Sequence, residues 1–482
     1  MTALTSLNEA SLEELIVAQM TATGGTPHWV EGDPKQFNAA YCLDLTTFRE
    51  FIRDTQPALI QALDLDGDSP TTHKFLARLQ GAITKQGIVA CLRDGMSHEQ
   101  HHVDLYYPTP SSRNAQALHL FGLNRLTITR QVHYSSREVG KSLDLVAFVN
   151  GLPVATFELK NQITNQTVED AVKQYKTNRD PREPIFAFGR AMAHFAVDDR
   201  NVRFSPKLAG PASWFLPFDQ GNNGGAGNPV NPGGVMTDYL WKTVLAPRSL
   251  ANIIENYATI VRTKNKKTGK KIDSAIFPRF HQLDVVRNLL ADVGAHGAGI
   301  RYLIQHSAGS GKSNSIAWLA HQLPGVERDG KRVFDSVIVV TDRVILDTQI
   351  RDTIKGFTQV GSTVKHADSS KDLREAIEAG KKIIITTVQK FPYIVQDLGG
   401  AQREKSFAII IDEAHSSQGG KVSAALAQAL SKDGLDQDVE DDEDALNRLM
   451  ESKKMLPNAS YLALLLYPWA IFGLIRPGST GL

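Results

Sequence analysis

A glycine-rich segment between an apolar stretch and a helix-forming stretch is the sequence feature that most constrains the fold. Residues 306–313 read His-Ser-Ala-Gly-Ser-Gly-Lys-Ser, after the apolar residues 302–305 and before the helix-forming residues 314–323. Glycines let backbone N–H groups wrap around an anion, and the positive end of the following helix adds to the attraction. The segment predicts a phosphate-binding loop, with His306 in place of the first glycine of the full pattern.

The side chains of this loop predict a site for ATP and Mg²⁺. Lys312 would supply positive charge to the β and γ phosphates, and the Ser313 hydroxyl would be a magnesium ligand. Gly309, Ser310 and Gly311 would contact the phosphates through their backbone. A glycine turn without a ligand is the alternative, and the strand, loop and helix around it argue against that alternative.

An acidic pair after a second apolar stretch supports the same chemistry. Asp412 and Glu413 follow residues 408–411 and precede Ala-His. Ligands bind at the carboxyl ends of parallel strands, so we expect Asp412 to hold Mg²⁺ through water and Glu413 to polarise the attacking water. Taken alone, the tetrapeptide is also compatible with surface charge after a strand, but its occurrence together with the phosphate loop argues against that alternative.

The second half of the chain alternates short apolar segments with helix-forming segments, which predicts a parallel α/β sheet. This domain is expected over residues 272–462, after a linker over 251–271. A helix is expected around 250–262, and the basic run 264–271 is expected as a surface linker or hairpin. The predicted strands cover residues 302–305, 336–340, 382–386 and 407–411.

The first domain, expected over residues 1–250, contains a predicted β-hairpin with a turn at Asn150-Gly151. Side chains alternate along a strand, so Glu158 and Lys160 share one face. A three-residue loop, or an equivalent bulge, would place Asp144 opposite Glu158, whereas a strict two-residue turn would place it opposite Phe157. We expect the first geometry.

This geometry predicts nuclease chemistry. Two carboxylates, Asp144 and Glu158, could hold one Mg²⁺ ion, and Lys160 could orient a water molecule or stabilise developing charge. A structural salt bridge is equally compatible with the acid-x-lysine pattern, because exposed Glu and Lys are common on strands. The same pattern at residues 33–35, 329–331 and 451–453 lacks a preceding apolar strand that bears an aspartate.

Residues 277–420 resemble the motor of superfamily 2 helicases and translocases, whose motifs occur here in order. The resemblance implies that Gln282, within Arg-Phe-His-Gln, hydrogen-bonds the adenine base. It also implies that the loops at 341–343 and 386–391 touch the DNA backbone.

With an Asp…Glu-x-Lys hairpin before the motor, most of residues 130–460 resemble the restriction and translocation subunit of type I restriction-modification enzymes, in its amino-terminal part. The implied fold class is α/β, with a restriction-endonuclease-like mixed-sheet domain followed by a RecA-like P-loop parallel-sheet domain. The implied activities are ATP-dependent DNA translocation and Mg²⁺-dependent cleavage. The implied partners are double-stranded DNA and the modification (methyltransferase) and specificity subunits. One departure is Ala171, which stands four residues before Tyr175 where related nucleases have glutamine; Gln174 could serve instead.

The carboxyl end departs further from this family, so residues 463–482 are expected as an aberrant or truncated tail. Family members continue into a second RecA-like lobe that supplies an arginine finger, so we expect Mg-ATP binding with poor turnover. The apolar run 461–475 is shorter than the ~20 residues of a membrane-spanning helix and contains Pro468, so no membrane partner is predicted.

Composition adds two constraints. The net charge is +1, so nucleic acid would have to bind through local basic surface. Cys42 and Cys91 are the only cysteines, which excludes a disulfide framework and suits the cytoplasm.

Three alternatives stay open: a motor with an inert nuclease-like domain, a helicase-nuclease of another type, and a non-catalytic remnant that binds DNA or partner subunits.

Overall fold

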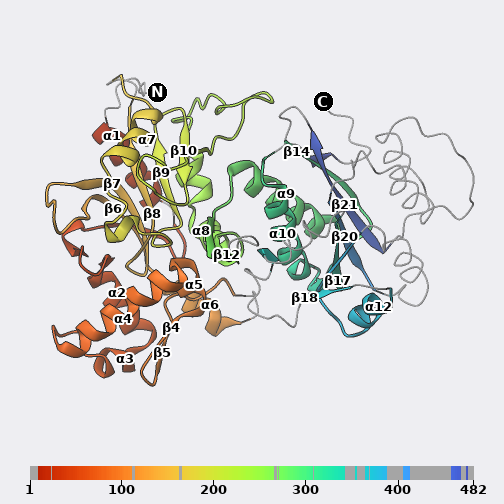
Figure 1. Ribbon diagram of the computed structural model, residues 1–482, viewed down its shortest axis with the longest axis horizontal. Helices are drawn as coiled ribbons and strands as arrows, with labels where there is room; N and C mark the ends of the chain where they lie inside the picture. The colour runs from red at the N-terminus through yellow and green to blue at the C-terminus, as the bar shows by residue number, and fades with distance from the viewer. Residues whose placement is uncertain are drawn as a thin grey trace, which may run out of the picture. The chain divides into compact units, whose positions relative to one another are not determined.

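The computed structural model divides into two compact units, Met1–Arg279 and Phe280–Leu482 (Figure 1). Among the helices of the described residues, none combines the length and the apolar character needed to cross a membrane. The structure describes residues 9–22, 24–110, 114–161, 165–264, 269, 271–307, 309–341, 353–354, 364–367, 370–387, 405–412, 458–467 and 474–475.

A mixed seven-stranded sheet forms the centre of the first unit, in the order β1-β6-β7-β8-β9-β10-β11. The pairs β1/β6 and β8/β9 are parallel, and the other neighbours are antiparallel. The strands are β1 (Trp29–Gly32), β6 (Leu126–His133), β7 (Ser142–Val149), β8 (Leu152–Leu159), β9 (Ala193–Val197), β10 (Val202–Ser205) and β11 (Leu216–Pro217).

Helices surround this sheet, and four of them, α2 to α5, gather at one side of the unit (Figure 1). Helix α7 lies in the connection between β8 and β9, as a parallel pair requires. The helices are α1 (Glu9–Thr21), α2 (Leu45–Thr55), α3 (Pro57–Ala62), α4 (Pro70–Gln86), α5 (Ile88–Asp94), α6 (Ala115–Gly122), α7 (Val168–Thr177) and α8 (Pro247–Asn256).

Helix α7 packs on the sheet through one apolar stripe. Its buried residues recur at the three- and four-residue spacing of one helix face, so the polar side chains of α7 lie on its other faces. The stripe consists of Val168, Ala171, Val172 and Tyr175 and meets Val132, Leu143, Val146, Phe148 and Ala196 of the sheet.

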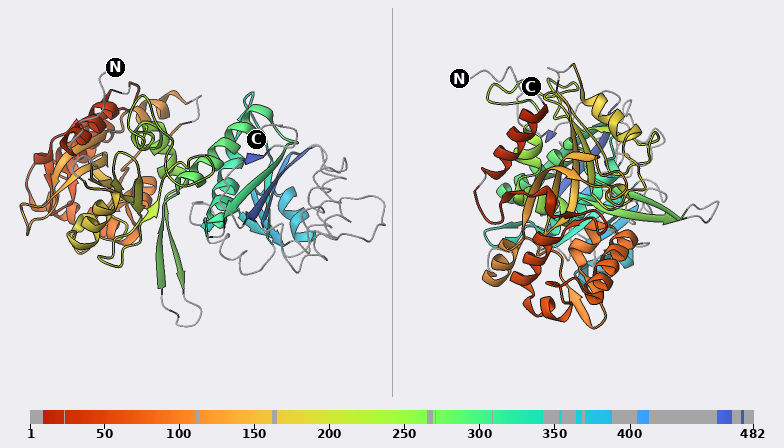
Figure 2. Two further views of the ribbon diagram at one scale, coloured as in Figure 1. Left: turned by 90° about the horizontal axis from the view of Figure 1, so that it is seen from above. Right: turned by 90° about the vertical axis from the view of Figure 1, so that its left-hand side faces the viewer.

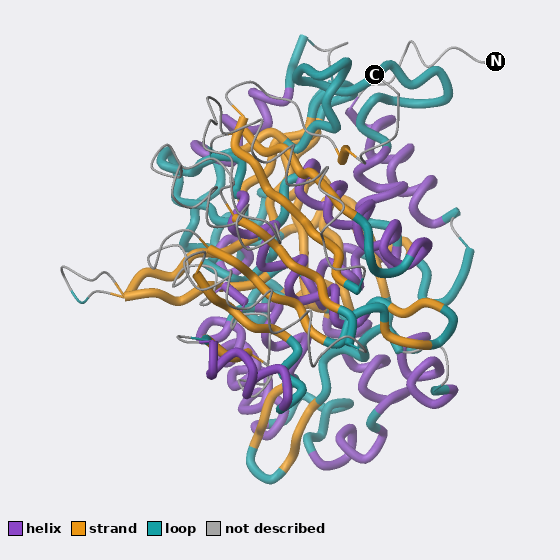
Figure 3. The backbone as a smooth tube through the Cα atoms, turned by 90° about the vertical axis from the view of Figure 1, so that its right-hand side faces the viewer, coloured by secondary structure: helices purple, strands orange, loops and turns teal. Residues whose placement is uncertain are grey.

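The predicted linker 251–271 belongs to the first unit. Helix α8 ends at Asn256, and β12 (Thr259–Lys264) pairs with β13 (Lys271–Ile276). The prediction of a helix to residue 262 was therefore wrong, because the β-branched residues after Ala258 pair in a strand instead. Lys264 and Lys271, the two ends of the basic run, pair with one another in this β12–β13 hairpin, which extends outward from the first unit (Figures 2 and 3).

A second seven-stranded sheet forms the centre of the other unit, in the order β18-β19-β17-β20-β21-β14-β22. Its neighbours are parallel except for β22 against β14. All four predicted strands are confirmed, as β14 (Arg301–Ser307), β17 (Ser336–Thr341), β19 (Ile383–Thr387) and β20 (Phe407–Asp412). The other elements are β18 (Val364–His366), β21 (Ala459–Tyr467), β22 (Leu474–Ile475), α9 (Phe280–His296), α10 (Lys312–Gln322) and α12 (Ser370–Glu378). Figure 2 shows α9 and α10 on one side of the sheet and α12 on the other.

Strand β21 lies in the interior of this sheet, between β20 and β14. The predicted end of the domain at residue 462 therefore falls inside a strand, and the sheet includes residues 463–467. Strands covered on both faces are nearly continuous apolar runs, which is the character of residues 461–466.

Candidate functional site

The β7–β8 hairpin places Asp144 opposite Glu158. Its turn has two residues, Asn150 and Gly151, both with positive φ (52° and 80°). The register changes between Ala147 and Phe148, so Leu145 pairs with Phe157. Continued by one residue, this register sets Asp144 against Glu158, which is the bulge geometry expected from the sequence.

Both carboxylates lie at low exposure in the interior of the sheet. Glu158 is 0% exposed and Asp144 is 9% exposed. Asp144 Oδ2 accepts the backbone N–H of Leu159 at 2.6 Å, which ties it to β8. Burial raises the pKa of Glu158 to about 8, the charge of Asp144 adds to the rise, and Arg179 and Lys160 oppose it.

Lys160 follows β8 and keeps the strand's pairing, since its N–H donates to the carbonyl of Val197 at 2.9 Å. Its side chain is 8% exposed, and its charge acts on Glu158. The three residues of the predicted nuclease site are therefore brought together.

Arg179, which the sequence reasoning missed, binds Glu158 through two hydrogen bonds. Its Nε donates to Oε1 at 2.6 Å and its Nη2 to Oε2 at 3.0 Å. Nη2 also donates to the carbonyl of Ser142 at 2.8 Å, and Nη1 lies 3.3 Å from the Tyr134 hydroxyl. Burial lowers the pKa of Arg179, but the bonds to Glu158 outweigh it and raise the pKa overall, so the guanidinium is charged.

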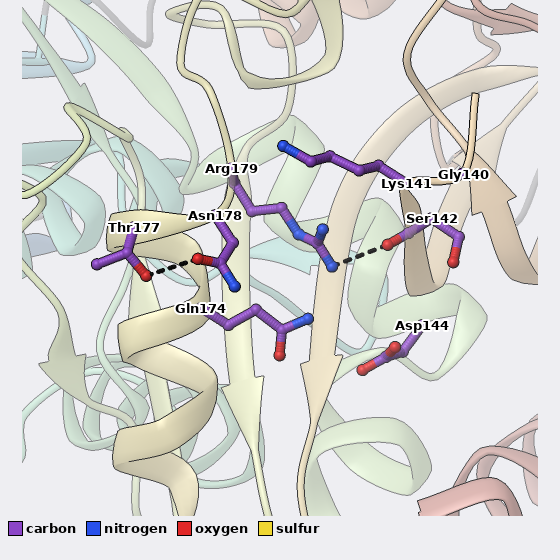
Figure 4. A pocket seen from close by; sticks show the side chains of 8 residues that line it. All are labelled: Gly140, Lys141, Ser142, Asp144, Gln174, Thr177, Asn178 and Arg179. Carbon is purple, nitrogen blue, oxygen red and sulfur yellow. Dashed lines mark hydrogen bonds between the residues drawn. The ribbon is translucent and has the colours of Figure 1, made fainter. Parts of the chain in front are cut away.

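A pocket of about 510 Å³ opens beside these residues. Gln174 of α7 and Asp144 of β7 point toward one another across it, and Arg179 lies between the two elements (Figure 4). Thr177 Oγ1 donates to Asn178 Oδ1 at 2.9 Å, which directs the Asn178 amide group. The wall is polar, and its residues are Gly140, Lys141, Ser142, Asp144, Gln174, Thr177, Asn178 and Arg179.

A network of buried polar side chains lies next to Glu158 on the same face of β8. Thr156, on the same face of β8, shares hydrogen bonds of 2.8 Å with the Tyr175 hydroxyl and with Nδ1 of His194. Burial lowers the pKa of His194 to about 3, so this imidazole is neutral. Tyr175 is thus engaged in the core, while Gln174 and Thr177 are the α7 residues that line the pocket.

The two carboxylates fit a magnesium ion. Mg²⁺ is usually bound by one or two carboxylates and keeps several water ligands. Within the described residues no group of three or more His, Cys, Asp or Glu side chains could hold a metal ion, so the donor set stays at Asp144 and Glu158. Burial is the main cause of the raised pKa of Glu158, and the negative charge of Asp144 adds to it; a cation between the two carboxylates would relieve that repulsion.

In the second unit the predicted phosphate loop joins β14 to α10. Gly309 and Gly311 have φ of 74° and 85°, a backbone conformation that favours glycine. A Cβ on Gly311 would lie 2.5 Å from Gln282 Nε2, so a side chain there would displace the Gln282 amide and would strain the backbone at this positive φ. Helix α10 begins at Lys312, which sets Ser310 and Gly311 at its amino end and Ser313 in its first turn.

Lys312 and Asp412 form a buried ion pair beneath this loop. Lys312 Nζ lies 2.9 Å from Oδ1 of Asp412, and their side chains are 8% and 0% exposed. Asp412 ends β20, and within the described residues neither of its buried oxygens accepts a hydrogen bond of good geometry. A carboxylate oxygen buried in this way fits a hard cation such as Mg²⁺, which prefers oxygen ligands.

Gln282 and His306 brace the loop. Gln282 Nε2 donates to the carbonyls of Ser310 and Gly311 at 2.9 and 3.0 Å. His306 Nδ1 lies 3.0 Å from Ser310 Oγ, and burial lowers the pKa of this imidazole to about 3. The residue that departs from the glycine pattern is therefore part of the loop's support.

Other predicted contacts fall at the edge of the described residues or beyond it. Thr341 is the last residue of β17, and Thr386 is the last but one of β19. Both side chains are buried. Glu413, and the remainder of the loops at 342–343 and 388–391, lie outside the described residues.

Arg179 had no sequence signal in any motif, since it lies 21 residues after Glu158 and two residues past the end of α7. Only the fold brings it to the carboxylate. A conserved spacing could not have been read from one sequence.

Two family models match the chain. Residues 48–212 match the model described as Type I restriction enzyme R protein N terminus, and residues 281–435 match the model described as SWI2/SNF2 ATPase. The matches fall in the first and the second unit respectively.

Two curated relatives extend over both units. The endonuclease subunit of the HindI type I restriction enzyme of Haemophilus influenzae is 24% identical over 443 residues, covering 86% of this chain and 39% of the relative. A candidate MjaIXP type I endonuclease subunit of Methanocaldococcus jannaschii is 24% identical over 309 residues, covering 60% and 28%. The chain spans less than two fifths of the length of either.

Solved structures match at low similarity. The UvsW helicase of bacteriophage T4 is 15% identical with a TM-score of 0.24, covering 42% of this chain and 55% of that one. A fragment of a candidate HsdR subunit from Vibrio vulnificus is 13% identical with a TM-score of 0.25, covering 70% and 47%. At these scores the fold rests on the strand order alone, which confirms the predicted class of a mixed-sheet unit followed by a parallel-sheet unit. By the family matches, the first unit is related to the amino-terminal part of type I restriction enzyme R proteins and the second to SWI2/SNF2 ATPases.

Proposed function

We propose that this chain acts as the amino-terminal part of the restriction and translocation subunit of a type I restriction enzyme. The first unit would be a Mg²⁺-dependent DNA endonuclease, and the second the first lobe of an ATP-driven DNA translocase. The observation that carries the proposal is the bulged register of the β7–β8 hairpin, which brings Asp144 opposite Glu158 with Lys160 beside them.

In the endonuclease site, Asp144 and Glu158 would hold Mg²⁺, which supplies charge neutralisation and a more acidic water. Lys160 would orient the attacking water or stabilise the negative charge that develops on the phosphate. Across the pocket, the amides of Gln174 and Asn178 are placed to donate to phosphate oxygens of the DNA backbone.

In the motor site, Lys312 would exchange Asp412 for the β and γ phosphates of ATP. Ser313 and Asp412 would hold Mg²⁺, and the backbone of Gly309, Ser310 and Gly311 would cradle the phosphates. We assign Glu413 to polarising the attacking water and Gln282 to the adenine base, which it would reach from its place against the loop.

The proposed partners are double-stranded DNA and the modification and specificity subunits. The support is the similarity over both units to a protein named as an endonuclease subunit of a type I restriction enzyme. In this proposal the other subunits read the DNA sequence.

Nicking of supercoiled plasmid in Mg²⁺ tests the endonuclease. We expect Asp144→Ala and Lys160→Ala each to lower the rate by ~10²-fold or more, because each removes a group that acts on the reacting phosphate. Lys35→Ala is the matched control, since Lys35 closes an exposed acid-x-lysine pattern in the same unit and should leave the rate unchanged. Equal residual nicking in all variants would contradict the proposal.

One observation favours a second candidate, a motor with an inert nuclease-like unit. Arg179 engages both oxygens of Glu158, as in a structural ion pair. In that case Asp144→Ala would change neither nicking nor metal affinity, while fluorescent ATP analogues would still bind the second unit and lose affinity in Lys312→Ala.

A further inference from the structure

Arg179 connects the strand of one carboxylate to the strand of the other. It grips Glu158 of β8 with Nε and Nη2, and the same Nη2 donates to the carbonyl of Ser142, two residues before Asp144 on β7. The guanidinium also lies over the Tyr134 ring, 5.5 Å from its centroid. Its place is thus fixed on several sides.

We propose that Arg179 is a positioning residue of the nuclease site, which holds the Glu158 carboxylate in the orientation that binds the metal ion. The inference rests on the proposed function, in which Asp144 and Glu158 are the metal ligands. Arg179 itself would touch neither metal nor DNA in this role.

The contacts favour positioning over blocking. Each oxygen of a carboxylate has two lone pairs, and Arg179 uses one on each oxygen of Glu158, so a second lone pair stays available to a cation. Ser142 and Tyr134 hold the guanidinium, and the Arg179 side chain is 7% exposed. Figure 4 shows the hydrogen bond from Arg179 to Ser142 at the pocket. A guanidinium tied in this way cannot advance into the space between the two carboxylates.

A lysine at position 179 could not replace arginine in this role. The planar fork of arginine fixes the plane of the carboxylate, whereas the lysine ammonium is a point charge on a flexible stem. Arg179→Lys therefore keeps the charge beside Glu158 and removes the orientation. Partners that orient metal ligands typically change metal affinity by ~10- to 100-fold when they are substituted.

The test is titration of the full chain with Mn²⁺ alone, without DNA or nucleotide. All variants carry Asp412→Asn, so that the carboxylate of the second unit does not contribute. We expect Arg179→Lys to weaken Mn²⁺ binding by ~10-fold and Arg179→Gln by up to ~100-fold. Arg182→Gln is the matched control, because Arg182 is three residues away, is 82% exposed and pairs with Asp180 at the surface; its Mn²⁺ affinity should equal that of the parent.

The outcomes separate the two levels of the proposal. Unchanged or tighter Mn²⁺ binding in Arg179→Lys, with binding lost in Asp144→Asn, would overturn the positioning role and leave the metal site in place. Unchanged binding in Asp144→Asn as well would overturn the nuclease site itself. Arg179→Lys carries the test if Arg179→Gln fails to fold, and a lower melting temperature with an unchanged Mn²⁺ affinity would mark a merely structural pair.

Discussion

Each unit holds a buried carboxylate against a cationic side chain, but the two pairs are built differently. In the first unit Arg179 bonds both oxygens of Glu158 and is itself tied to Ser142 and Tyr134. In the second unit Lys312 approaches one oxygen of Asp412, which accepts no well-formed hydrogen bond from the described residues. A planar guanidinium with several hydrogen-bond partners suits an ion pair that stays together. A lysine ammonium on a flexible side chain suits an ion pair in which the lysine exchanges one partner for another. The difference separates a site that is held ready from a site that must rearrange when its ligand arrives.

The largest effect should distinguish the pairs by stability. Arg179→Met leaves Glu158 buried without the guanidinium that pairs with it, and we expect the first unit to lose ~3–5 kcal/mol of unfolding free energy. Lys312→Met removes one contact from Asp412, and we expect the second unit to lose ~1–3 kcal/mol. Amide hydrogen exchange of β7 and β8, and of β14 and β20, measures the two separately. Equal losses would show that the difference in geometry has no energetic meaning.

The second effect comes from ligand. Mg-ATP at 100 times its dissociation constant should stabilise the second unit by ~2.7 kcal/mol, since it binds the folded state alone. Protection should rise in β14 and α10 and stay constant in β7 and β8. Lys312→Met should abolish the rise, whereas Arg179→Lys should leave it intact; protection that rises in both units would contradict the separation.

The third effect is a dependence on pH confined to the first unit. The pKa of Glu158 is raised to about 8 by burial and by Asp144, so the anion that would bind the metal under the proposed function is lost below that pH. We expect nicking to fall by ~10-fold per pH unit from pH 8 to pH 6. Stability should move the other way, because a raised pKa adds stability that is complete below about pH 4.5, the ordinary value for Glu, and is lost as the pH rises through 8.

The second unit provides the contrast for that measurement. Burial lowers the pKa of His306, beside the phosphate loop, to about 3, so this histidine stays neutral across the same range. Binding of an ATP analogue should therefore show no step from His306 between pH 6 and pH 8. A flat nicking profile in this range would argue against Glu158 as a ligand that must lose its proton.

The smallest effect should come from the loop's unusual histidine. His306→Gly restores the glycine of the general phosphate-loop pattern but removes the hydrogen bond to Ser310. We expect ATP affinity to fall by ~3- to 10-fold, the equivalent of one lost hydrogen bond of ~1 kcal/mol. Equilibrium titration with a fluorescent ATP analogue measures it, and tighter binding would show that His306 does not support the loop.

Much of both units could be predicted because their signals are local. The Asn150-Gly151 turn and the alternation of the flanking strands predicted the hairpin, and apolar runs predicted four strands of the parallel sheet. The sequence was compatible with two registers of this hairpin, and the structure has the one that is shifted between Ala147 and Phe148. The phosphate loop was predicted because glycine positions and Lys312 belong to one short segment.

The errors share a different cause. The helix that was expected to continue to residue 262 ends at Asn256. Residues 259–264 form strand β12 instead, because they pair with β13, which lies beyond the basic run in the sequence. The domain was expected to end at residue 462, within strand β21, because the partners of this strand, β14 and β20, lie far away in the chain. Arg179 was missed because nothing in its neighbourhood shows that Glu158 will face it. Long-range partners decided each case.

The interior place of β21 has a consequence for how the chain is made. Strand β14 pairs with β21 across about 160 residues, so during synthesis the second sheet has an open gap between β20 and β14 until residue 467 has left the ribosome. The first unit, whose sheet closes within residues 29–217, can finish folding long before that point. We therefore expect a nascent chain in which the first unit is folded while the sheet of the second unit is still incomplete. Chaperones would then have to shield the unpaired backbone edges of β14 and β20.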